Sequence, residues 1–141
     1  MKVSVIIPVL NEAESIMELV GSLWLQSRPP DEIVITDGGS TDKTKEIICK
    51  LMSKETPIRL IGTNYAYPGV ARNIAISVAK HDVIAFVDAG VRINHQWLEE
   101  LLKPLETDPS VDVVFGHYEP RQDTFFTKCA AIAYVEPPIP R

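Results

Sequence analysis

Polar, acidic and glycine residues that could do chemistry follow four separate apolar runs in this sequence. The segments that carry them are PVLNE (8–12), TDGGSTD (36–42), TNYAYPGVARN (63–73) and DAGVR (88–92). The carboxylate oxygens of Asp37 and Asp88 can accept hydrogen bonds from a base or a sugar, or hold a divalent cation. Arg72 follows a glycine turn and lies just inside an expected helix, where a guanidinium and free backbone N–H groups bind phosphate oxygens. Together these residue types suit a nucleoside diphosphate.

Several common nucleotide and hydrolase motifs are missing from the sequence. No G-x-G-x-x-G follows the first apolar run, which argues against a dinucleotide-binding Rossmann site. There is no G-x-x-x-x-G-K-[ST] phosphate loop and no G-x-S-x-G elbow. A phosphatase-like α/β domain with Asp37 as nucleophile stays open as an interpretation, although no second aspartate stands two residues further on to assist it.

Apolar patterns predict the elements that must position these residues. Continuous apolar, β-branched runs predict strands over 3–9, 32–36, 58–62, 82–90 and 111–118. Helical spacing predicts helices over 11–26, 40–54, 70–80 and 94–105, and a further helix over 123–135. The side chains expected to turn inward include Ile16, Leu19, Leu23, Met52, Val70 and Leu98. Asn11 is the expected N-cap of the first helix, and Ser40, Thr41 and Asp42 are expected to cap the second.

The regular alternation of strands and helices predicts an α/β fold. Strand–helix–strand connections of this kind give a three-layer α/β/α sandwich with a mainly parallel sheet. In such a sheet ligands bind at the carboxyl ends of the strands. The four chemically rich segments all follow strands, whereas plainer connections such as RPPDE (28–32) and AKHD (79–82) precede them. We therefore expect one binding crevice at the carboxyl edge of the sheet.

The bulk properties of the chain exclude some classes of protein. A length of 141 residues suits one domain, and a net charge of −5 argues against a broad nucleic-acid surface. Cys49 and Cys129 have no metal-binding spacing. The start MKVSVIIPVLNE lacks the pattern of a signal peptide, and no apolar run approaches the roughly 20 residues that cross a bilayer. These features predict a cytoplasmic location.

Four segments of the chain resemble one known family in their order and spacing. The segments VSVIIPVLNEAESI, EIVITDGGSTDKT, GVARNIAISVAKHDVIAFVDAG and INHQWLEEL are similar to the nucleotide-binding half of family 2 glycosyltransferases with the Rossmann-like GT-A fold. The resemblance implies inverting transfer of a sugar from a nucleotide-sugar donor, with a UDP-sugar expected, to a sugar, lipid or protein acceptor. It makes 1–120 the donor-binding subdomain and 121–141 the start of a truncated acceptor-side region or a C-terminal tail. Any membrane association of the full-length protein would be peripheral, at the inner face.

The resemblance also assigns residues to the donor site. The residues it places there are Pro8, Val9, Asn11, Glu12, Asp37, Gly38, Arg72, Asn73, Asp88 and Ala89. It puts the segment 8–12 against the base and ribose, and makes Asp37 the acid that hydrogen-bonds the base. Arg72 falls near the diphosphate, and Asp88 falls on the first aspartate of the D-x-D motif, which addresses the ribose and the metal. The alternative to ligand contact for Asp37 is a purely structural role, in which it caps the turn between its strand and the second helix.

Two departures from the family pattern put the metal in question. Members usually read D-D-G-S where this chain has Asp37-Gly38-Gly39-Ser40, and D-x-D where it has Asp88-Ala89-Gly90. A divalent cation, Mn²⁺ or Mg²⁺, would have Asp88 as its ligand, although Mg²⁺ often uses only one or two carboxylates. Without a metal, Arg72 or Arg92 would have to stabilise the leaving diphosphate.

A third departure concerns the general base that takes the acceptor's proton. Members of the family carry it in a later acidic pair, and no such pair follows FGHYEP (115–120) in this sequence. An alternative function is therefore a truncated or degenerate, non-catalytic nucleotide-binding module.

Overall fold

Strands and helices alternate along the computed structural model, which describes residues 1–52, 57–64 and 67–117. The elements are β1 (Val3–Val9), α1 (Ile16–Trp24), β2 (Glu32–Asp37), α2 (Thr44–Leu51), β3 (Ile58–Gly62), α3 (Pro68–Val78), β4 (Val83–Phe86) and α4 (Trp97–Thr107). The helix predicted over 123–135 and the subdomain boundary at 120 lie outside the described residues. In the part of the chain that the structure describes, no helix is long and apolar enough to cross a membrane.

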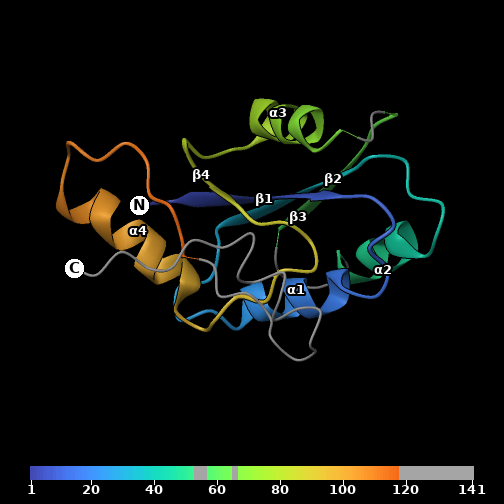
Figure 1. Ribbon diagram of the computed structural model, residues 1–141, viewed down its shortest axis with the longest axis horizontal. Coiled ribbons are helices and arrows are strands. Elements are labelled where there is room, and N and C mark those ends of the chain that lie inside the picture. Colours follow the sequence, from blue (N-terminus) through green and yellow to red (C-terminus); the bar gives the residue numbers. More distant parts are fainter. Residues whose placement is uncertain (53–56, 65–66, 118–141) are drawn as a thin grey trace, which may run out of the picture.

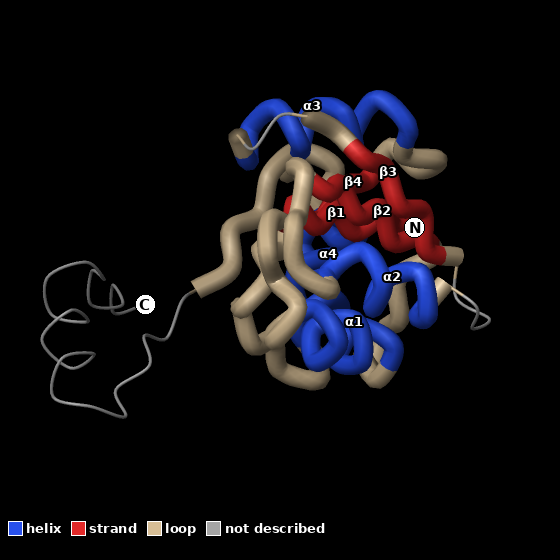
Figure 2. Tube along the Cα trace, turned by 90° about the vertical axis from the view of Figure 1, so that its right-hand side faces the viewer, coloured by secondary structure: helices blue, strands red, loops and turns tan. Residues whose placement is uncertain are grey.

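The sheet is parallel and has helices on both faces. Its strand order is β3-β2-β1-β4, and each neighbouring pair is parallel. Figure 1 and Figure 2 show α3 on one face of the sheet and α1, α2 and α4 on the other. The register sets Val9 beside Asp37 and Asp37 beside Gly62, so the ends of three strands share one edge. The predicted three-layer α/β fold is therefore confirmed.

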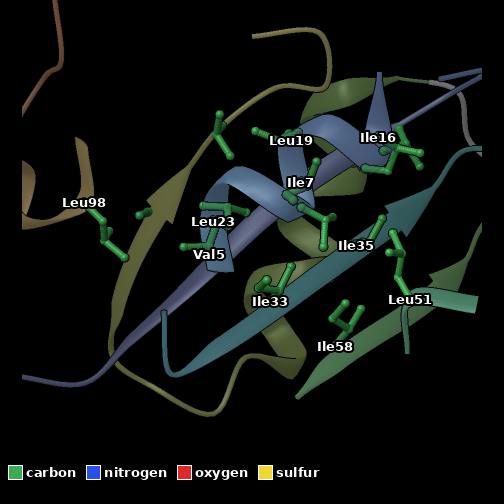
Figure 3. Close-up of a cluster of buried hydrophobic side chains, with 14 of the residues drawn as sticks. Val5, Ile7, Ile16, Leu19, Leu23, Ile33, Ile35, Leu51, Ile58 and Leu98 are labelled. Atoms are coloured by element: carbon green, nitrogen blue, oxygen red, sulfur yellow. The ribbon is translucent and has the colours of Figure 1, made fainter. Parts of the chain in front are cut away.

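Both faces of the central strands β1 and β2 are buried, which explains why these strands are mostly apolar without alternation. The larger core lies between the sheet and the helices α1, α2 and α4 (Figure 3). Ile7, Leu23 and Leu98 in this core are completely buried. Burying such a side chain contributes about 1.5–3 kcal/mol. A smaller cluster of Ile6 and Val34 packs against Ala75 of α3 on the opposite face.

The strand predicted over 111–118 is wrong for its described part, because residues 111–117 have no strand structure. Val113 and Phe115 are 65% and 89% exposed. A β-branched run supplies propensity only, and a strand forms only where the run also pairs with a neighbouring edge, which residues 111–117 do not do. β4 is paired with β1 alone within the described chain.

Several predicted helix limits also differ from the structure. α1 begins at Ile16 with Ser15 as N-cap, and Asn11 instead takes a left-handed φ of 57°. α2 begins at Thr44 rather than at residue 40. Met52 and Val70, predicted to be buried, are 40% and 38% exposed. The two helices begin later than predicted because Asn11 and Ser40, which were expected to cap them, form hydrogen bonds with another loop.

Candidate functional site

The loops that follow β1 and β2 are joined to each other by hydrogen bonds. The backbone N–H of Gly38 donates to the carbonyl of Val9 at 2.9 Å. The backbone N–H of Asn11 donates to Ser40 Oγ at 2.9 Å, and Asn11 Oδ1 accepts the backbone N–H of Thr41 at 2.9 Å. The left-handed backbone of Asn11, a conformation that asparagine tolerates better than most residues, brings both groups to face the second loop.

A second set of bonds ties the start of α2 to the segment before α1. Thr44 is buried, and its Oγ1 accepts the backbone N–H of Glu12 at 2.8 Å. Asp42 accepts the backbone N–H of Ala13 at 3.2 Å and that of Thr44 at 3.0 Å. The hydrogen bond from the Thr44 hydroxyl is the main reason why the pKa of Asp42 lies below its ordinary value. Ser40 and Thr41 thus join two loops and do not cap α2 as predicted, whereas Asp42 bonds both to the other loop and to Thr44 at the start of α2.

Asp37 lies at the end of β2, and its side chain is completely buried. Its carboxylate accepts the backbone N–H groups of Gly39 and Ser40, each at 3.2 Å. Lys45 Nζ lies 3.2 Å from Asp37 Oδ2. Burial by itself would raise the pKa of Asp37, but the bonds from Ser40, Lys45 and Gly39 outweigh it and leave the pKa below its ordinary value. The carboxylate is thus ionised and shapes its own turn, and a buried, fully bonded Asp37 does not suit the nucleophile of a phosphatase.

Lys45 is a member of this site that the sequence interpretation missed. It stands in the first turn of α2, where the positive end of the helix dipole disfavours a cation. A lysine at such a position is a signal that a carboxylate partner lies nearby. The sequence could have supplied that signal, but only the structure shows that the partner is Asp37.

Arg72 and Asp88 meet at the same edge of the sheet. Arg72 lies in the first turns of α3 and Asp88 follows β4, and the distance from Arg72 Nη2 to Asp88 Oδ1 is 2.5 Å. The two side chains are 33% and 50% exposed. Together with Phe86 and Val87 they line a depression of about 300 Å³. Of their predicted neighbours, Asn73 is exposed and Ala89 packs partly buried against the core.

A wider depression of about 480 Å³ lies over the joined loops. Its lining residues are Asn11, Glu12, Ala13, Glu14, Ser15, Asp42 and Lys43. The Glu12 carboxylate faces back to its own loop and accepts Ser15 Oγ at 2.5 Å. Val9 and Gly38 are buried beneath the loops, and Pro8 is half-buried. The predicted site residues therefore form two groups on the carboxyl edge, one on the joined loops and one at Arg72 and Asp88.

The sequence and the fold of this chain are similar to those of known proteins. Residues 4–135 match the family model described as glycosyl transferase family 2. The chain belongs to this family. Glycosyltransferase GlyG of Streptococcus pneumoniae is 31% identical over 117 residues, which cover 82% of this chain and 38% of GlyG. The poly(ribitol-phosphate) β-N-acetylglucosaminyltransferase TarS of Staphylococcus aureus is 37% identical over 103 residues, which cover 71% of this chain and 18% of TarS.

Solved structures of family members show the same fold. TarS residues 1–349 in complex with UDP superimposes with a TM-score of 0.67 at 32% identity, over 75% of this chain and 32% of that one. The mannosyltransferase PcManGT of Pyrobaculum calidifontis, in complex with GDP-Man and Mn²⁺, gives a TM-score of 0.71 at 28% identity, over 78% of this chain and 33% of that one. The chain thus spans less than two fifths of the length of each of these relatives.

The residues present do not fit a metal site built on two carboxylates. Asp88 supplies one carboxylate, and its Oδ1 is bound by Arg72. The second position is Gly90, which has no side chain and a left-handed φ of 84°. Across residues 1–52, 57–64 and 67–117 there is no group of three or more His, Cys, Asp or Glu side chains that could hold a metal ion. Arg92 is turned away to Glu18 of α1, with Nε 3.1 Å from Glu18 Oε1.

Proposed function

We propose that this chain binds a nucleotide-sugar donor at the carboxyl edge of its sheet, and that the protein to which it belongs transfers the sugar with inversion. The observation that carries the proposal is the meeting of Arg72 and Asp88 beside an open depression, in a chain of glycosyl transferase family 2. TarS was crystallised with UDP and with UDP-GlcNAc, and PcManGT with GDP-Man, so a nucleoside-diphosphate sugar is the ligand class of the relatives. We infer a UDP-sugar for this chain.

The joined loops form the platform for the nucleoside in this proposal. Asn11 and Glu12, which line the depression over these loops, face the base and ribose, and the rest of the segment from Pro8 to Glu12 supports them from below. Asp37 and Gly38 shape the turn against which the base rests, since the carboxylate of Asp37 is occupied by its own turn and by Lys45. Asp88, whose side chain is half exposed, orients the ribose. A base contact by Asp37 itself would require that turn to open.

Arg72 has the main electrostatic role. In an inverting displacement the acceptor oxygen attacks the anomeric carbon while the nucleoside diphosphate leaves with increased negative charge. A guanidinium placed at the departing phosphate stabilises that charge in the transition state. Asn73 and Ala89 flank the same contact along the chain. The residues at this position do not supply a two-carboxylate metal site.

The acceptor side of the reaction is not assigned to any described residue. An inverting transfer needs a base for the proton of the acceptor hydroxyl. The acceptor class, the cytoplasmic location and the peripheral membrane association stay predictions from the sequence. The second candidate function, a non-catalytic nucleotide-binding module, draws on the glycines at positions 38 and 90.

Isothermal titration calorimetry of the 141-residue chain with UDP tests the donor site. We expect saturable binding of UDP, and ATP as a nucleotide outside the ligand class should not compete. The absence of binding by UDP, GDP and TDP alike would refute the proposal. Incubation of the same chain with a radiolabelled UDP-sugar and a panel of acceptors separates the two candidate functions, since transfer of the label excludes the non-catalytic module.

A further inference from the structure

We propose that the guanidinium of Arg72 takes the place that a divalent cation holds in metal-dependent donor sites, so that this chain binds a nucleoside diphosphate without metal. The proposal rests on the proposed function and specifies its charge chemistry. The observations behind it are the ion pair between Arg72 and Asp88, the conformation of Gly90 and the position of Arg92.

The carboxylate available to a cation is already neutralised by Arg72. The 2.5 Å contact joins Arg72 Nη2 to Asp88 Oδ1, and both groups stay partly exposed to the depression beside them. A metal ion at Asp88 would compete with the guanidinium for the charge of this carboxylate and would gain only one protein carboxylate. A guanidinium has five N–H donors in a fixed fork, so Arg72 can keep its bond to Asp88 and still donate to phosphate oxygens.

The surroundings of the pair favour this direct charge contact. Phe86 and Val87 line the same depression, and Phe86 is 47% exposed there. An apolar wall reduces the screening of a charge contact relative to open water. Arg92, which follows Asp88 by four residues, pairs with Glu18 of α1 instead.

Lack of space does not exclude a side chain at position 90. A Cβ built on Gly90 would have no heavy atom within 4 Å, so the position has room for a side chain. Its φ of 84° disfavours most residues, and Asp and Asn are among the better tolerated ones. The substitution Gly90→Asp can therefore restore a second carboxylate here, at the cost of some backbone strain.

Calorimetric titration of UDP into the full 141-residue chain, once with Mn²⁺ and once with EDTA, tests the inference. We expect dissociation constants that agree within about twofold, whereas Arg72→Gln should weaken binding roughly tenfold or more in both buffers. Arg28→Gln is the matched control. Arg28 is 34% exposed and pairs with Asp31 at 2.7 Å, but it lies at the opposite edge of the sheet, so its loss should leave UDP binding unchanged.

The reconstruction provides a second, independent readout. Gly90→Asp should make UDP binding tighter in Mn²⁺ than in EDTA, because it restores a second carboxylate next to Asp88. Gly90→Asn places a similar side chain on the same backbone without the charge, and should show no such difference.

The outcomes separate this inference from the function on which it rests. Wild-type chain that binds UDP in Mn²⁺ but loses it in EDTA would overturn the inference and leave the donor site standing. Arg72→Gln that binds as tightly as wild type would also overturn it. No binding of UDP or GDP in either buffer would overturn both the inference and the proposed function.

Discussion

Asn11 and Thr41, 30 residues apart in the sequence, are joined by a hydrogen bond of 2.9 Å from the Thr41 backbone N–H to Asn11 Oδ1. The bond crosses from the loop after β1 to the loop after β2, and the Asn11 backbone returns a bond to Ser40 Oγ. The two loops therefore form one surface. Its shape depends on the left-handed φ of Asn11 as well as on its side chain.

Two substitutions at Asn11 separate the backbone and side-chain contributions. Asn11→Ala removes the hydrogen-bond acceptor. It also places alanine, which tolerates the left-handed region less well than asparagine, at this backbone position, so we expect a loss of about 2 kcal/mol in the free energy of unfolding. Asn11→Gly keeps the backbone conformation accessible and should lose only about 1 kcal/mol. Urea unfolding measures both values. Equal losses would show that the left-handed conformation carries no cost at this position.

Asp37 should make the stability of the protein fall in acid. Its pKa in the folded state lies below the ordinary 3.8, so the unfolded chain binds the proton more readily. The stabilisation is fully present above about pH 5 and is lost as the pH falls through the folded pKa. Asp37→Asn should cost about 2 kcal/mol at pH 7, because the charged acceptor of the turn is lost.

The measurement is urea unfolding of both proteins between pH 7 and pH 3. The curve of Asp37→Asn should be flatter on the acid side, and the difference between the two proteins should shrink as the pH falls. Parallel curves over the whole range would show that Asp37 is not the group that responds. Part of the slope should survive in the variant, because the bonds from Arg28 and Val3 outweigh burial and hold the pKa of Asp31 low as well.

Gln26 is a buried polar residue that should be important for the stability of the protein. It is 5% exposed, and its Oε1 accepts the backbone N–H of Leu98 at 3.0 Å, at the start of α4. Its Nε2 donates to the carbonyls of Asn94 at 2.7 Å and Ser22 at 3.2 Å. Gln26→Ala leaves these groups unpaired and should destabilise the protein by about 2 kcal/mol or more in urea unfolding.

Gln96 supplies the control for that experiment. It is the same residue type, is exposed and lies beside the same helix start. Gln96→Ala should change stability by less than about 0.5 kcal/mol. Comparable losses for the two substitutions would mean that the buried amide network does not hold α4.

Thr36 and Thr44 are both completely buried, and they should respond in opposite ways to the loss of a hydroxyl. Thr36 Oγ1 has no hydrogen-bond partner within the described residues. Thr36→Val, which removes a desolvated hydroxyl at constant shape, should therefore be neutral or stabilising by about 1 kcal/mol. Thr44→Val breaks the bonds to Glu12 and Asp42 and should cost about 2 kcal/mol. Thermal unfolding of both variants checks the contrast, and a destabilised Thr36→Val would refute it.

The sequence alone predicted the layers of the fold and the edge on which the site lies. Runs such as 3–9 and 32–36 are mostly apolar and show no alternation, because both faces of a parallel sheet are buried, and this pattern is local. The direction of each strand follows from the alternation with helices, so the placement of Asp37, Arg72 and Asp88 on one edge was also predictable. The predicted strand over 111–118 failed in its described part, since pairing depends on a neighbouring edge and not on the run itself.

Only the tertiary structure decided which residues bind each other. The decisive bonds join positions far apart in sequence, from 16 residues between Arg72 and Asp88 to 72 between Gln26 and Leu98. No local period encodes such a partner, because it is set by where the folded elements place the two groups. For this reason the sequence identified Arg72 and Asp88 as separate site residues, and the structure showed that one neutralises the other. For the same reason Ser40 to Asp42 were predicted as helix caps, whereas in the structure they form the hydrogen bonds that join the loops after β1 and β2.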